Sequence, residues 1–290
     1  MEPIIWMNLS GVYELEDFYK NNHFSWKEID LKDLPNTNCY IDDKSKNHIR
    51  EKIANINERI HYLDSGNYHY LSLLWMEKIQ EDFALVLLDD HPDMQMPTFG
   101  PITSCGAWVR EALEELPHLK RIYHLGASEQ LMKDVLVNWR KELEKEKANL
   151  GMAGLSDQVV AMSLKPTKDM PRPDLHFQAL SKISVISQDN NNAEYWKKIW
   201  EVEKLPVYVS IDKDVMGRTE TPCDWSQGIM KFRALEHFLV TLPSQNRLLG
   251  LDVCGEESSD NYQDAQINEQ VNLDLAKYLE YAVCKDERKE

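Results

Sequence analysis

The chain has 290 residues, a length at which α/β proteins often form one domain around one large core. A hydrophobic fraction of 42% and a charged fraction of 28% exclude a disordered chain. The net charge of −16 disfavours nucleic acid and anionic membranes as partners, since both reward patches of Lys and Arg, and it favours cationic ligands and divalent metals.

The first residues predict a cytoplasmic protein. The start, MEPIIWMNLSGVYELEDFYK, is acidic where a secretory signal is basic, and its apolar run is too short to span a bilayer. The five cysteines are scattered and include no C-x-x-C pair, which argues against a disulfide framework or a zinc knuckle.

Strands and helices are predicted to alternate along the chain. Residues 10–60 are polar and weakly periodic, and we expect them to form an N-terminal helical elaboration. Apolar runs rich in β-branched residues predict strands over 4–9, 83–89, 121–127, 182–188, 206–212 and 247–254. Apolar residues at helical spacing predict helices over 68–80, 106–116, 128–150, 192–204, 232–242 and 271–285.

This alternation predicts the fold class. Strands that are apolar throughout and alternate with helices indicate a mostly parallel sheet covered on both faces, so we expect a three-layer α/β/α sandwich. No repeat or linker marks a boundary, and residues 1–290 are therefore predicted to be a single domain. Ligands bind such sheets beyond the carboxyl ends of the strands.

Acidic residues crowd two of these strand ends. The second predicted strand runs into a D-x-H-x-D pattern made of Asp89, His91 and Asp93, and the fifth ends in a D-x-D pattern made of Asp212 and Asp214. Residues two apart in an extended segment share a face, so these side chains can point into one volume while the intervening lysine turns away. Unpaired carboxylates there would be costly, which predicts two divalent cations.

Each acidic pattern also has a simpler structural interpretation. A lone D-x-D at a strand end usually marks a turn or a helix cap, but two acidic patterns after apolar strands favour a metal site. Two metals need more than five donors, and His69, which follows a glycine-containing turn and opens a predicted helix, is the candidate for a further ligand. His237 lies inside an amphipathic helix, where packing is the usual role.

The motifs resemble those of the ureohydrolase superfamily of arginases and agmatinases. The family's D-x-H-x-D motif resembles residues 89–93 (DDHPD), its D-x-D motif resembles residues 212–214 (DKD), and its G-G-D-H loosely resembles residues 66–69 (GNYH). The order of motifs covers residues 60–260. This resemblance implies an arginase-like fold and hydrolysis of a guanidino C–N bond with release of urea.

The resemblance also implies a cofactor and a ligand set. Two Mn²⁺ ions, for which zinc or iron are alternatives, would activate water for attack on the guanidinium carbon. Asp93 would handle the proton that reaches the departing amine. The first acid of each motif, Asp89 and Asp212, would bridge the two metals. The full ligand set would be His69, Asp89, His91, Asp93, Asp212 and Asp214.

Departures from the family bear on the substrate. Cys105 stands near the place of a rim histidine, either as a proton carrier or as a small apolar residue. Where arginases hold the carboxylate and amine of free arginine, the polar residues here are mainly Gln95 and Thr98. This favours agmatine or an arginine within a peptide, which would give ornithine. The stretches HPDMQ and SCGAWV are similar to an atypical branch that acts on peptidyl arginine.

The family binds the guanidinium with a glutamate after the last strand. Glu256 and Glu257 are both candidates, and a solvated acidic loop is the alternative for each. Many relatives form homo-oligomers, but no residue pattern here marks an interface.

Two further functions fit the same residues. A single-metal deacetylase of acetylated lysine shares this fold with fewer acidic ligands, and the presence of both His69 and Asp93 favours two metals. A catalytically silent scaffold is favoured by the missing rim histidine and the glycine-poor metal loop. Metal content and urea release discriminate among the three.

Overall fold

The computed structural model describes residues 2–95, 102–127, 135, 159–162, 203–242, 246–258 and 261–287. The strand predicted over 182–188, the helix predicted over 128–150 except Val135, and most of the helix predicted over 192–204 lie outside these ranges.

An eight-stranded sheet forms the centre of the molecule, and all its neighbouring strands run parallel. The spatial order is β2-β1-β4-β10-β9-β5-β7-β8. A separate antiparallel pair is formed by β3 (Tyr40–Ile41) and β6 (Thr103–Ser104). The strands of the main sheet are β1 (Ile4–Asn8), β2 (Trp26–Asp30), β4 (Ile60–Tyr62), β5 (Phe83–Leu88), β7 (Leu119–Leu125), β8 (Val159–Met162), β9 (Val207–Asp212) and β10 (Leu248–Cys254).

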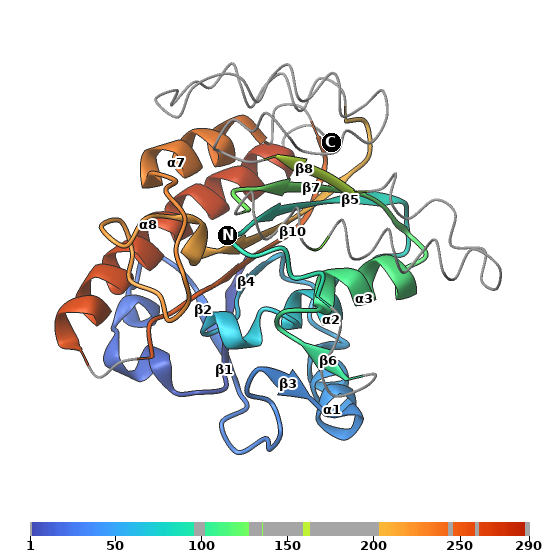
Figure 1. The fold of residues 1–290 in the computed structure, drawn as a ribbon. Helices are drawn as coiled ribbons and strands as arrows, with labels where there is room; N and C mark the ends of the chain where they lie inside the picture. Colours follow the sequence, from blue (N-terminus) through green and yellow to red (C-terminus); the bar gives the residue numbers. More distant parts are fainter. Residues whose placement is uncertain are drawn as a thin grey trace.

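Helices cover both faces of this sheet (Figure 1). On one side lie α7 and α8, and on the other lie α1, α2 and α3. The predicted α/β/α sandwich is therefore confirmed. The helices are α1 (Asp43–Ile53), α2 (Leu71–Met76), α3 (Trp108–Glu115), α7 (Phe232–Thr241) and α8 (Tyr262–Glu287), with short 3-10 turns η1 (Val12–Leu15), η2 (Phe18–Lys20), η3 (Gly66–Tyr68) and η5 (Lys213–Val215).

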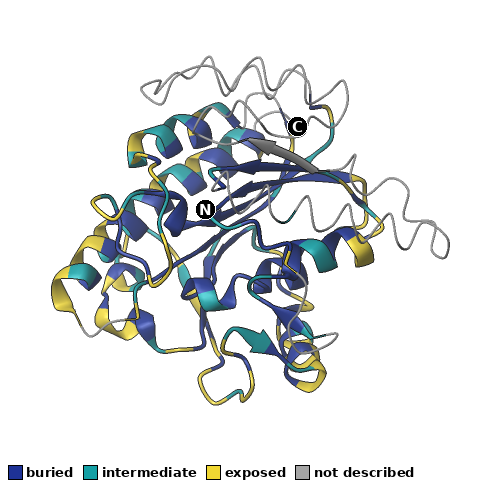
Figure 2. Ribbon diagram, in the orientation of Figure 1, coloured by how far each residue is buried: buried dark blue, intermediate teal, exposed yellow. Residues whose placement is uncertain are grey.

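Alternation along the central strands builds two cores. In β5, Ala84, Val86 and Leu88 pack into the core under α7 and α8, whereas Leu85 and Leu87 pack into the core under α1 to α3. Successive side chains of a strand point to opposite faces, so a strand covered on both sides must be apolar throughout. Figure 2 shows the central strands buried along their described lengths.

The helical interpretation of residues 10–60 is wrong in part. The segment contains α1, but it also contributes β2, which pairs with β1 at the edge of the main sheet. Of the residues in β2 only Ile29 is buried, because an edge strand has a neighbour on one side only. Such a strand lacks the continuous apolar run that identified β5 and β9. The three-residue β4 was missed because it is too short to show a period.

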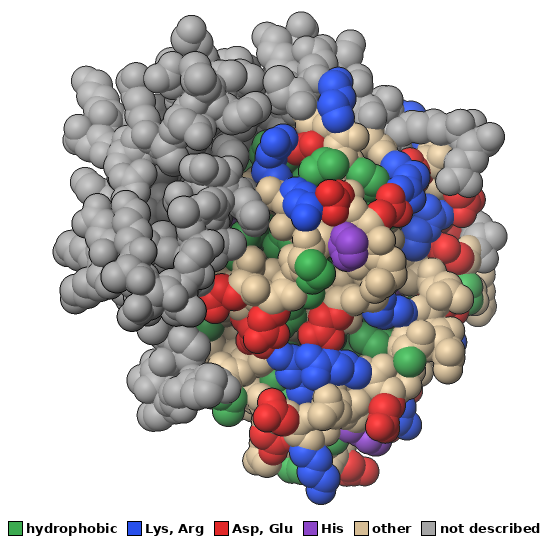
Figure 3. Space-filling view, turned by 90° about the vertical axis from the view of Figure 1, so that its right-hand side faces the viewer, with side chains coloured by type: hydrophobic (Ala, Val, Ile, Leu, Met, Phe, Trp, Pro, Cys, Tyr) green, Lys and Arg blue, Asp and Glu red, His purple; other side chains and the backbone are tan. Residues whose placement is uncertain are grey.

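The described surface is mixed in charge on the face drawn in Figure 3, where acidic and basic side chains are interspersed. Among the described residues, no helix combines the length and apolar character needed to cross a bilayer. All five cysteines are free thiols.

Candidate metal centre

Four adjacent strands bring the predicted ligands together. Because β4, β10, β9 and β5 are neighbours and parallel, their carboxyl ends meet at one edge of the sheet. Asp89 follows β5, Asp212 ends β9, and Asp214 lies in η5 directly after it. His69 follows η3 on the connection from β4 to α2, and Cys254 ends β10.

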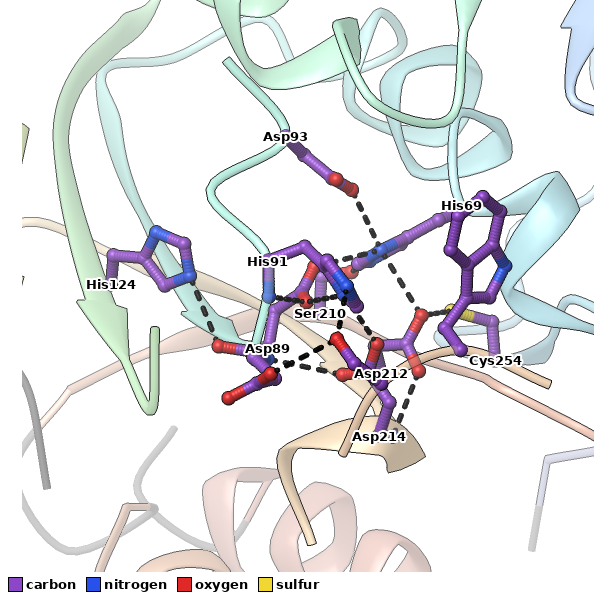
Figure 4. Close-up of polar contacts among 12 residues, drawn as sticks. His69, Asp89, His91, Asp93, His124, Ser210, Asp212, Asp214 and Cys254 are labelled. Carbon is purple, nitrogen blue, oxygen red and sulfur yellow. Dashed lines mark hydrogen bonds and ion pairs between the residues drawn. The ribbon is translucent and has the colours of Figure 1, made fainter. Parts of the chain in front are cut away.

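The side chains form three candidate ligand groups, of which two share the Asp89 carboxylate (Figure 4). In the first group, His69 Nδ1 lies 3.2 Å from Asp89 Oδ2 and 3.2 Å from Asp93 Oδ2. In the second, His91 Nδ1 lies 3.6 Å from Asp89 Oδ1 and 2.7 Å from Asp214 Oδ2. Asp89 thus directs one oxygen to each histidine, as a bridging ligand would.

Asp212 belongs to the third group, which it forms with His69 and Cys254. Its Oδ2 lies 3.5 Å from His69 Nδ1 and accepts a hydrogen bond from the Cys254 thiol at 3.2 Å. Two donor atoms, each about 2.1 Å from one cation, are about 3.0–3.4 Å apart at right or tetrahedral angles. The separations around His69 therefore match a cation held between these side chains.

Buried atoms without partners support the fit to metal. His69 Nδ1 and Asp89 Oδ2 are buried and face each other, and neither has a partner in hydrogen-bonding geometry among the described residues. A buried polar group without a partner is costly, and a coordinated cation would satisfy both atoms. The donor set of carboxylates and imidazoles suits manganese, zinc or iron.

A serine orients each histidine from its far side. His69 Nε2 lies 2.9 Å from Ser210 Oγ, and His91 Nε2 lies 2.9 Å from Ser226 Oγ. A proton on Nε2 that is donated to the serine leaves Nδ1 as the free donor atom toward the carboxylates. Both serine contacts are thus compatible with metal binding through Nδ1 of the histidine.

The carboxylates perturb one another strongly. Burial and the charge of Asp89 raise the pKa of Asp93 to about 7 and also raise the pKa of Asp212. Burial, together with the charges of Asp212 and Asp89, raises the pKa of Asp214 well above its ordinary value. Burial favours neutral imidazole, but contact with Asp214 and Asp89 outweighs it and raises the pKa of His91 to about 12. Without cations, this cluster holds protons in their place.

Local backbone structure fixes the position of each acid. The Asp214 N–H donates to Asp212 Oδ1 at 2.9 Å, so the D-x-D pattern closes one 3-10 turn. Gly255 follows β10 at φ +98°, and a Cβ there would lie 2.3 Å from Asp212 Oδ1. Only glycine allows this close approach. Asp93 has φ +49°, and the Trp108 indole N–H donates to its Oδ2 at 2.6 Å.

The carboxylates line a pocket of about 220 Å³. Above them, the described wall is made of small, polar and aromatic side chains and contains no Lys or Arg. Gln95 and Cys105 belong to this wall as predicted, whereas Thr98 lies outside the described residues. The described lining residues are Cys39, Tyr40, Gly66, Asp89, His91, Asp93, Gln95, Ser104, Cys105, Gly106, Ala107, Asp212, Asp214 and Trp225.

Cys105 lies at the pocket but in surroundings that keep its proton on. Burial and the charge of Asp93 raise the pKa of the Cys105 thiol above its ordinary value. A proton carrier would need a lowered pKa in an electropositive setting. The surroundings therefore favour the small apolar role over the proton-transfer role.

The acids after β10 do not line the described pocket. Glu256 is fully buried, and its Oε1 accepts from Lys213 Nζ at 2.5 Å and from Asn272 Nδ2 at 3.0 Å. Glu257 lies 3.5 Å from Arg218. Glu256 thus forms an internal ion pair with Lys213, and the predicted contact of Glu256 or Glu257 with substrate stays a prediction.

Glu16, which directly follows η1, lies beside this ion pair and accepts from Asn272 Nδ2 at 2.8 Å, and its raised pKa favours a proton on its carboxyl group. Burial and the charge of Glu256 raise the pKa of Glu16 from 4.5 to about 10. The folded protein holds this proton while the unfolded chain releases it above about pH 4.5, so the stabilisation is present at low pH and is lost as pH rises toward 10. We expect the free energy of unfolding to fall by up to about 1.4 kcal/mol per pH unit from this group.

The variant Glu16→Gln should therefore flatten the fall in stability between pH 6 and 9, measured by urea unfolding. Glu14→Gln is the matched control, because Glu14 is exposed on the same turn. Equal pH slopes for Glu16→Gln and the unmodified protein would show that Glu16 carries no such proton.

Several site residues were missed by sequence reasoning. Ser210 and Ser226 orient the histidines, Trp108 holds Asp93, and Cys254 contacts Asp212. The position of Ser210, two before Asp212 in a strand and hence on the same face, was the one usable signal. The others come from segments whose proximity only the folded chain determines.

Comparisons with known proteins agree with this architecture. No family model matches the chain. An uncharacterised protein of Thermotoga maritima is 26% identical over 218 residues, 75% of this chain and 66% of that protein, slightly under two thirds of the relative's length. Among solved structures, an arginase from Medicago truncatula has a TM-score of 0.61 at 18% identity, with 98% of this chain and 86% of that chain covered.

Two further structures show the same likeness. Proclavaminate amidino hydrolase of Streptomyces clavuligerus has a TM-score of 0.61 at 14% identity, covering 98% of this chain and 91% of that one. Formimidoylglutamase of Bacillus subtilis has a TM-score of 0.60 at 13% identity, covering 96% of this chain and 86% of that one. The chain therefore has the α/β fold of these solved structures. More specifically, it has the fold of the ureohydrolase superfamily, as the motif resemblance predicted.

Proposed function

We propose that the protein is a binuclear, manganese-dependent hydrolase that cleaves a guanidino C–N bond and releases urea. The observation that supports this most is the pair of ligand groups that share Asp89 at a pocket. When bound, the metal ions would supply positive charge and a water activated near neutral pH. They would be held by the six residues predicted from the motifs, His69, Asp89, His91, Asp93, Asp212 and Asp214.

The chain's own groups would orient the substrate and move the proton. Asp93, fixed by the Trp108 indole, would carry a proton to the departing amine. The described pocket wall has no Lys or Arg to pair with a free α-carboxylate. We therefore propose that the substrate lacks this charge and is either agmatine or an arginine within a peptide, the latter giving ornithine.

Urea release tests the proposal. The protein is loaded with Mn²⁺ and assayed with agmatine, free arginine and an Nα-acetyl-arginine peptide amide, and bound metal is counted per chain. We expect urea from agmatine or the peptide, its loss after chelation, its return with Mn²⁺, and close to two metals per chain. Acetate release from an acetyl-lysine peptide with one metal per chain would instead indicate the deacetylase. A fully metal-loaded protein inactive on every compound would indicate a scaffold.

A further inference from the structure

Of the two aromatic side chains that line the described pocket, Tyr40 and Trp225, Trp225 is the more exposed. Trp225 lines the pocket and is 44% exposed, one of few large hydrophobic side chains left open among the described residues. An indole combines a large apolar surface with a polar edge, so one left partly open at a charged pocket is available to contact a ligand.

The indole of Trp225 is held rigidly. Its Nε1–H donates to Asn67 Oδ1 at 3.0 Å, and Asn67 Nδ2 donates to Asn38 Oδ1 at 2.9 Å. Its ring meets the His91 ring edge to face, with centroids 5.8 Å apart. A side chain fixed at its polar edge and along one ring contact presents its remaining surface without the entropy cost of ordering it on binding.

Trp225 also lies beside the metal ligands. A Cβ on Gly66 would be 3.0 Å from Trp225 Cδ1 and 3.1 Å from Asp212 Oδ2, which places the indole within about 6 Å of that carboxylate. The absence of a side chain at Gly66 allows this approach. A ligand cation that enters the pocket beside this carboxylate can therefore meet the ring, whose quadrupole attracts a cation within about 6 Å of its centroid.

The guanidinium of the proposed substrate needs such a partner. The acids after β10 do not line the described pocket, and Glu256 is already paired with Lys213. The four carboxylates that line it are the proposed metal ligands. Resting on the proposed function, we propose that the exposed face of Trp225 binds the planar guanidinium of the substrate by cation–π stacking and so determines specificity for a cationic side chain.

Binding measurements with a charged and a neutral ligand test this role. Isothermal titration calorimetry at 4 °C uses the Mn²⁺-loaded protein with Nα-acetyl-arginine methylamide and with Nα-acetyl-citrulline methylamide, a neutral analogue of the same shape. Urea is assayed in the recovered sample to detect turnover of the ligand. Where turnover occurs, KM is compared between variants instead of Kd. We expect Trp225→Leu to weaken the arginine ligand about tenfold and the citrulline ligand less than threefold.

Trp225→Phe keeps an aromatic face and should weaken the arginine ligand by less than Trp225→Leu. Tyr262→Leu is the control, because Tyr262 is an aromatic residue 67% exposed on α8. Metal content is measured in each variant, since Trp225 contacts the His91 ring, and Trp225→Phe decides the question if Trp225→Leu loses metal.

The outcomes separate this inference from the proposed function. No binding of the arginine ligand by the unmodified protein, or equal losses for the two ligands in Trp225→Leu, would overturn the role of Trp225. Binding that depends on Trp225 without urea release would support it and reject the hydrolase. Urea release with an unchanged KM in both Trp225 variants would support the hydrolase and overturn the role of Trp225.

Discussion

Asp89→Asn is expected to abolish tight binding of both metal ions and with it the release of urea. Asp89 directs Oδ2 to His69 and Oδ1 to His91, so it serves both ligand groups. Asparagine keeps the shape but has a neutral amide with one oxygen. Changes to groups that merely support a ligand weaken metal binding about 10- to 100-fold, so loss of a shared charged ligand should exceed about 100-fold.

Metal content after equilibrium dialysis, and the rise in melting temperature on adding Mn²⁺, measure this effect without any substrate. The unmodified protein should be stabilised by the metal because the native state alone holds the complete site. Asp89→Asn should show no such rise. Asp90→Asn is the matched control, since Asp90 is the next residue and belongs to neither ligand group. Two tightly bound metals in Asp89→Asn would contradict the shared-ligand arrangement.

The acidic motifs could be predicted because they depend on local geometry. Asp89, His91 and Asp93 follow an apolar strand, and Asp212 ends another, so the carboxyl ends of a parallel sheet bring them together whatever the rest of the chain does. Because alternate residues of a strand face opposite sides, the same reasoning predicted that Lys213 points away from Asp212 and Asp214. These steps need only the direction of a strand and the spacing of its residues.

The remaining contacts depend on segments far apart in the chain. Trp225 reaches the pocket through a loop that packs on Gly66, and Asn67 fixes it across 158 residues of sequence. Glu256 and Glu257 could not be separated by counting, because Gly255 turns the chain through a left-handed conformation before them. Loop conformation and side-chain pairing of this kind are determined by tertiary packing and leave no periodic pattern of apolar residues in the sequence.

Lys213→Met should cause the largest loss of stability among these variants. Lys213 is fully buried, and its Nζ lies 2.5 Å from Glu256 Oε1 and 3.3 Å from Asn272 Oδ1. Removing the ammonium leaves the Glu256 carboxylate buried without its cation. Breaking one side of a buried ion pair costs about 3–5 kcal/mol, and we expect the free energy of unfolding in urea to fall by this amount.

A double variant separates the lost pair from lost packing. Lys213→Met with Glu256→Gln removes both charges and keeps similar volumes, so it should be more stable than Lys213→Met alone. Lys231→Met is the surface control. The Lys231 ammonium lies 3.0 Å from Glu220, the Lys231 side chain is 63% exposed, and such exposed pairs contribute about 0–1 kcal/mol. A loss in Lys213→Met no larger than in Lys231→Met would refute a stabilising buried pair. Lys213 lies between Asp212 and Asp214, so the loss of its ion pair should also loosen the D-x-D turn. Mn²⁺ should therefore restore less stability to Lys213→Met than to the double variant.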